Sequence, residues 1–175
     1  MFRDSPHSIH NYPIVVHPLF NAIEDGVAFS ASQRVSISNG STVGFYFENP
    51  SGSGKKVYIV AIIARGKAEG DIDIYEGATV TTPGTAITPR NLNLGSTNTS
   101  VCNIEYGGAY DISGANLVKP DVLPGGSGVR AVGDLAEVGD TIIMPPGTSL
   151  LVNVTNTSQS ASDYAVSFKW IEVTE

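Results

Sequence analysis

The alternation of apolar and polar residues along most of the chain restricts what it can fold into. In residues 43–47, 150–154 and 166–170, every second residue is a large apolar one. Side chains two apart on a strand point to the same face of a sheet, so each run predicts a strand with one apolar face. We find no amphipathic helical pattern in the 175 residues. The sequence therefore predicts an all-β fold.

One face of each predicted strand should form the core. Residues 57–64 are almost continuously apolar, which is typical of a strand covered on both faces. The runs 150–154 and 166–170, joined by 156–162, predict a terminal hairpin. The predicted core consists of Val43, Phe45, Phe47, Val57, Ile59, Ile63, Ile72, Ile74, Leu150, Val152, Val154, Val166, Phe168 and Trp170.

Many short strands with loops of varied length favour a jelly-roll-like antiparallel β-sandwich. We expect this domain to span residues 27–175. Residues 106–147 are rich in glycine and proline, so we expect one or two short strands there within a long loop excursion.

Residues 1–26 predict an extended N-terminal arm, because Pro6, Pro13 and Pro18 interrupt any helix. The arm is too apolar to remain in water, and either its own domain or a neighbouring subunit should cover it. Its candidate interaction residues are Tyr12, Ile14, Val15, Val16, Leu19 and Phe20.

The charge of the chain argues against two classes of partner. Its net charge is −7, whereas binding to nucleic acid or to an anionic membrane surface requires a basic footprint. No apolar run approaches the roughly 20 residues that cross a bilayer. The single cysteine, Cys102, lies in a strand-like run and is expected to be a small buried side chain.

We expect no enzyme, metal site or cofactor. The three histidines, His7, His10 and His17, all lie in the arm, so the β-domain has no histidine to act as a base or a metal ligand. Residues 52–55 resemble a phosphate-binding loop but lack its first glycine and its following Ser or Thr, and a hairpin turn is expected instead.

Other candidate residues have similarly simple interpretations. Asp71, Asp73 and Glu76 are expected on a solvated strand face, with weak calcium binding as the alternative. Tyr106 and Tyr110, beside glycines, remain open as a surface for stacking on sugars.

Two stretches resemble a known group of proteins. One runs from residues 48–55 (ENPSGSGK) to 81–96 (TTPGTAITPRNLNLGS), and the other is 144–156 (MPPGTSLLVNVTN) with a strand ending at 169–172 (KWIE). Together they resemble virion proteins of tailed phages and prophages of the head decoration, cement or fibre type. The resemblance implies a β-sandwich that oligomerises, commonly as a trimer, on a capsid.

The leading expectation is therefore a decoration or cement protein on the virion head surface. It would bind the major capsid protein as a homo-oligomer, with a trimer favoured. The alternatives are a tail, baseplate or head-fibre module, which uses the same fold, and a carbohydrate-binding module.

Overall fold

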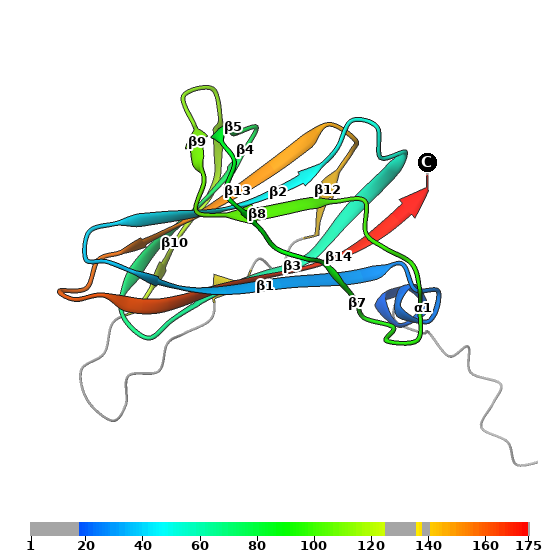
Figure 1. Ribbon diagram of the computed structural model, residues 1–175, viewed down its shortest axis with the longest axis horizontal. Helices are drawn as coiled ribbons and strands as arrows, with labels where there is room; N and C mark the ends of the chain where they lie inside the picture. Colours follow the sequence, from blue (N-terminus) through cyan, green and yellow to red (C-terminus); the bar gives the residue numbers. More distant parts are fainter. Residues whose placement is uncertain (1–17, 125–135, 138–140, 175) are drawn as a thin grey trace, which may run out of the picture.

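The structure is a computed structural model that describes residues 18–124, 136–137 and 141–174. Within these residues, two antiparallel six-stranded sheets pack face to face, beside a small two-stranded sheet (Figure 1). Sheet A has the order β11-β3-β14-β1-β7, with β12 also paired to β3, and sheet B has the order β10-β4-β13-β2-β8-β6. The prediction of an all-β antiparallel sandwich is confirmed.

The strands have the following bounds. Sheet A contains β1 (Ala28–Ile37), β3 (Lys55–Gly66), β7 (Arg90–Asn91), β11 (Ala136–Glu137), β12 (Ile142–Met144) and β14 (Ser162–Thr174). Sheet B contains β2 (Thr42–Asn49), β4 (Gly70–Glu76), β6 (Thr85–Ala86), β8 (Asn103–Tyr106), β10 (Asn116–Leu123) and β13 (Thr148–Asn156). The small sheet pairs β5 (Thr79–Thr82) with β9 (Ala109–Asp111).

The chain crosses between the two sheets from β1 to β2, β3 and β4 in turn, and again from β13 to β14. β13 belongs to sheet B and β14 to sheet A, so the predicted terminal hairpin is wrong. The turn at residues 51–54 is likewise not a hairpin, because it joins β2 of sheet B to β3 of sheet A. Each of these strands has one apolar face, and crossing between the sheets lets consecutive strands bury those faces against each other.

Two fully buried asparagines hold the corners where the chain crosses. The Asn156 side chain donates a hydrogen bond to the Ile37 carbonyl at 2.7 Å, after β13. The Asn49 side chain donates to the carbonyls of Lys55 (2.8 Å) and Met144 (2.9 Å), after β2. These bonds satisfy backbone carbonyls that leave the sheet ladders at the corners.

The predicted core residues occupy the space between the sheets, with one exception. Val43 is half-buried and packs against the core, and the others except Ile63 are buried. The Phe47 ring of sheet B lies 5.4 Å from Phe168 and 5.1 Å from Trp170 of sheet A, which joins the two layers.

The exception arises from a β-bulge. In the pairing of β14 with β3, Lys169 is opposite Ala61 but Trp170 is opposite Ile59, so β3 has one extra residue at Val60. An extra residue in one strand makes every later side chain of that strand point to the opposite face of the sheet. Ile62 is therefore buried and Ile63 is half-exposed, contrary to the prediction.

The end of the predicted arm is helical rather than extended. α1 (Pro18–Glu24) begins at a proline, which is tolerated at the first helical position because no N–H is needed there. It ends before Gly26, whose φ of 68° suits a glycine helix cap. Ala22 is buried, and the amides of Asn91 and Asn98 both donate to the Gly26 carbonyl, so this segment packs on the sandwich.

The predicted loop excursion contains more strand than expected. It includes β9, β11 and β12, each of two or three residues, and the eight-residue β10, which pairs with β4. Residues 125–135 and 138–140 of this stretch lie outside the described part of the chain.

Candidate functional site

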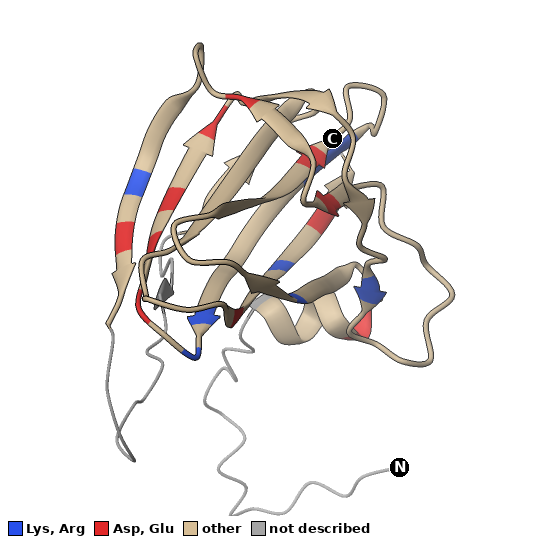
Figure 2. Cartoon of the chain, turned by 60° about the vertical axis from the view of Figure 1, so that its left-hand side comes forward, with Lys and Arg blue, Asp and Glu red and all other residues tan. Residues whose placement is uncertain are grey.

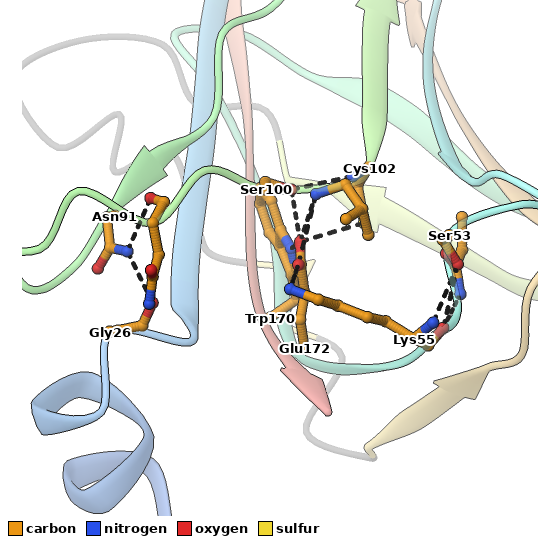
Figure 3. A network of polar contacts seen from close by, with 11 residues as sticks. Gly26, Ser53, Lys55, Asn91, Ser100, Cys102, Trp170 and Glu172 are labelled. Carbon is orange, nitrogen blue, oxygen red and sulfur yellow. Dashed lines mark hydrogen bonds and ion pairs between the residues drawn. The ribbon is translucent and has the colours of Figure 1, made fainter. Parts of the chain in front are cut away.

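A carboxylate lies buried at the end of the sandwich where β14 ends (Figure 3). Glu172 accepts hydrogen bonds from the Trp170 indole N–H (3.1 Å), the Ser100 hydroxyl (2.5 Å) and the Val101 N–H (3.1 Å). The Lys55 ammonium lies 3.1 Å from its second oxygen. Both oxygens are thus engaged, and the neighbouring cation compensates the buried charge.

The facing of β14 explains why a carboxylate is found there. Glu172 follows Trp170 by two residues, so it continues the core-facing side of the strand. The core residues predicted from the sequence end at Trp170 and do not include Glu172. Glu172 could have been found as an acidic residue that continues the apolar alternation of Val166, Phe168 and Trp170.

Cys102 lies in the same cluster and is buried, as expected. Its Sγ atom is 3.7 Å from Glu172 Oε1. Burial, followed by the negative charge of Glu172, raises the pKa of the thiol to about 12. Because the thiolate is the nucleophilic form, this environment keeps the side chain unreactive at neutral pH. The cluster, which we call the Glu172 clip, therefore joins β3, β14 and the segment before β8 through hydrogen bonds and one ion pair.

The two tyrosines that remained open are packed against other rings. Tyr106 stacks on Phe45 at 6.1 Å, and Tyr110 stacks on Tyr46 at 5.5 Å. A Cβ at Gly44 would lie 2.7 Å from the Tyr110 ring, so glycine is needed for this approach. Burial also raises the pKa of Tyr110 to about 12. One ring face of each tyrosine is thus covered by another aromatic ring, and both side chains are half-buried.

The acidic strand residues lie on β4. Asp71 and Glu76 are exposed, Asp73 is half-buried, and Glu76 accepts a hydrogen bond from the Asn116 amide at 3.1 Å. Among the described residues, no three His, Cys, Asp or Glu side chains come together to hold a metal ion. The three histidines of the arm lie outside the described residues.

A groove of about 730 Å³ lies between α1 and the outer face of sheet A. We call it the α1 groove; its lining includes Leu19, Ala22, Val27, Tyr58, Val60, Ile171 and Val173. Of the predicted interaction residues, Leu19 lines the groove and Phe20 is 64% exposed. The other four, Tyr12, Ile14, Val15 and Val16, lie outside the described residues.

Apolar side chains continue beyond the groove across the outer face of sheet A. Ile143 of β12, Tyr58 of β3 and Ile171 of β14 are opposite one another in neighbouring strands. Ile143 is 53% exposed and Val173 is 45% exposed. Charged side chains flank this apolar surface on the same face, because Lys56 is opposite Val173 and Lys169 precedes Ile171 by two residues. Figure 2 marks Lys and Arg on several separate strands.

Comparisons with models of protein families, with curated proteins and with solved structures find no match. In the described part of the chain, no helix has the length and hydrophobicity to cross a membrane.

Proposed function

We propose that this protein is a structural component of a virus particle that decorates the head surface and binds the major capsid protein as a homo-oligomer, with a trimer favoured. The observation that carries the proposal is the exposed apolar surface of sheet A, formed by Ile143, Tyr58, Ile171 and Val173. A continuous apolar surface on a soluble protein marks a site of contact with other proteins. The protein would act through contact area, multiplied by the avidity of an oligomer, rather than through turnover of a substrate.

The strand order supports a jelly roll as the finer description of the sandwich. In sheet A, the late strand β14 lies between β1 and β3, and in sheet B, β13 lies between β2 and β4. Two Greek keys wound together place late strands between early ones in this way, and the arrangement is used in viral capsid domains. Because one fold serves many functions, the apolar surface rather than the strand order carries the functional proposal.

The low charge of the chain agrees with a protein partner. Charged residues make up 15% of the chain, against about 25% in typical domains. Charged residues are depleted at the centres of protein interfaces, whereas apolar and aromatic ones are enriched.

The test compares two substitutions on particles of the virus or prophage that encodes the chain. Ile143→Lys places a charge on the apolar surface, and Val122→Lys is the matched control on β10, where Val122 is 65% exposed. We expect hundreds of wild-type copies per particle by quantitative mass spectrometry, strong loss of occupancy with Ile143→Lys, and normal occupancy with Val122→Lys.

Other outcomes would contradict the proposal. A few to some tens of copies per particle would indicate a tail, baseplate or fibre module instead. Absence from particles combined with binding of the isolated protein to a glycan array would indicate a carbohydrate-binding module. Equal occupancy of particles by the two variants would show that the apolar surface does not contact the capsid.

A further inference from the structure

The α1 groove has an apolar surface that can bind aliphatic side chains. Tyr58, Val60 and Ile171 are half-buried along its floor, and Val173 is 45% exposed at its end. Of its two acidic lining residues, Glu172 is engaged by Ser100 and by the Trp170 indole N–H, and Asp25 is exposed just after α1. The remaining surface is largely apolar, so it favours an uncharged, aliphatic occupant.

The chain itself carries such a segment close to the groove. Residues 12–16 read Tyr-Pro-Ile-Val-Val and contain no charged side chain. Seventeen residues precede Pro18, the first residue of α1, which forms one wall of the groove. The segment is thus tethered at the edge of an apolar surface that matches its composition.

The sequence of the tether favours a groove on another copy. A chain that leaves the start of α1 must reverse direction to lie along the flank of the same helix. Residues 14–17 contain none of the residues that favour a turn, which are Gly, Pro, Asn, Asp and Ser, and the flanking Pro18 directs the preceding residue into an extended conformation. The β-branched Ile14, Val15 and Val16 also favour an extended chain.

The tether fixes how close the second copy must come. Residues 12–16 end two residues before Pro18, so an extended backbone places Val16 up to about 7 Å and Tyr12 up to about 20 Å from the start of α1. The exchange therefore requires a second copy whose groove lies directly beside the start of α1.

We propose that residues 12–16 of one copy occupy the α1 groove of a second copy of this chain. The exchange joins copies into an oligomer and covers Tyr58, Ile171 and Val173 in each of them, which leaves Ile143, outside the groove lining, as the part of the apolar surface open to a capsid contact. It deepens the proposed function, because it names the contact that forms the homo-oligomer, and it concerns self-association whether or not the assembly sits on a capsid.

The test is disulfide trapping between two differently substituted full-length chains, in the absence of capsids. One chain carries Val16→Cys and the other carries Val173→Cys, while Val122→Cys on β10 replaces the second as a matched control. The native Cys102 is buried and does not compete. We expect a covalent dimer from the first mixture, several-fold more abundant than from the control mixture.

The oligomeric state provides a second measurement. By light scattering, the wild-type chain should be an oligomer, and removal of residues 1–17 should give a folded monomer. A chain with both Val16→Cys and Val173→Cys that forms an internal disulfide, with no dimer in the mixture, would show that the segment fills its own groove and would overturn the proposal. Equal trapping at positions 173 and 122, or a monomeric wild type, would overturn it as well. A monomeric wild type would also contradict the homo-oligomer of the proposed function, whereas an oligomer without trapping at position 173 would overturn only the exchange, and capsid binding is tested separately by occupancy of particles.

Discussion

At the scale of single residues, Glu172 shows how a charged group can occupy the core of a sandwich. It is 2% exposed, yet three hydrogen-bond donors and the Lys55 ammonium surround its two oxygens. Its partners Ser100 and Val101 come from a segment about 70 residues away in the sequence. Hydrogen bonds to charged groups contribute more to stability than neutral ones, which makes this cluster sensitive to the loss of charge.

The first prediction concerns Glu172→Gln, which keeps the shape of the side chain and removes its charge. The Lys55 ammonium then lacks a counter-charge, and an amide NH₂ replaces one acceptor. We expect the free energy of unfolding in urea to fall by about 1–3 kcal/mol. The control Glu76→Gln lies on the surface and should change it by less than about 0.5 kcal/mol. Equal losses in the two variants would show that the cluster contributes nothing particular.

The second prediction concerns stability at high pH. The pKa of Cys102 is about 12 in the folded protein against an ordinary value of 9.0, so its contribution is fully present below pH 9. As the pH rises from 9 toward 12, the unfolded chain releases this proton first, and stability falls. We expect urea midpoints to begin falling near pH 9.

Cys102→Ala provides the control for this pH dependence. In that variant the decline should begin nearer pH 10, the ordinary value for tyrosine, because burial also raises the pKa of Tyr110 to about 12. A wild type and a variant with parallel pH profiles would contradict the assignment to the thiol.

At the scale of elements, alternation predicted which residues share a face but not where a strand changes phase. The apolar run in β3 continues through the bulge at Val60, so nothing in its composition distinguishes Ile62 from Ile63. The bulge is visible in the pairing with β14, which is a non-local contact. α1 was missed because seven residues are too few for a helical period to be recognised, and packing rather than propensity stabilises so short a helix.

The third prediction uses the bulge. Ile62→Ala removes a buried side chain and should cost about 2–5 kcal/mol of unfolding free energy. Ile63→Ala, the neighbouring substitution with the same loss of atoms, should cost about 1 kcal/mol or less because that side chain is half-exposed. Chemical denaturation of both variants measures the difference. The reverse order would show that β3 keeps an unbroken register.

At the scale of the whole molecule, the layers could be predicted from the sequence, whereas the strand partners could not. Each alternating run indicated its own apolar face, which is a local property. β1 pairs with β14 from Ala28–Ile171 to Ile37–Ser162, so the two strands meet across most of the chain. The buried corner asparagines Asn49 and Asn156 also resemble ordinary loop residues until the crossing between sheets is known.

The fourth prediction separates α1 from the residues before it. Removal of residues 1–17 leaves α1 in place and should give a folded monomer, whose thermal midpoint is the reference. Removal of residues 1–26 also exposes the start of β1 and deprives the Asn91 and Asn98 amides of the Gly26 carbonyl. We expect that midpoint to fall by roughly 5–10 °C, corresponding to a few kcal/mol for a domain of this size. Equal midpoints for the two truncations would show that α1 contributes no stability.

The placement of β1 and β14 also has a mechanical consequence. Ala28, at the start of β1, pairs with Ile171 near the end of β14, so the two strand ends lie at the same edge of the sandwich (Figure 1). A force that pulls these two ends apart loads the interstrand bonds one after another, like a zipper, and such bonds open at lower force than bonds loaded together. The Glu172 clip and the bond from the Glu172 N–H to the Val27 carbonyl (2.9 Å) lie where that opening would begin.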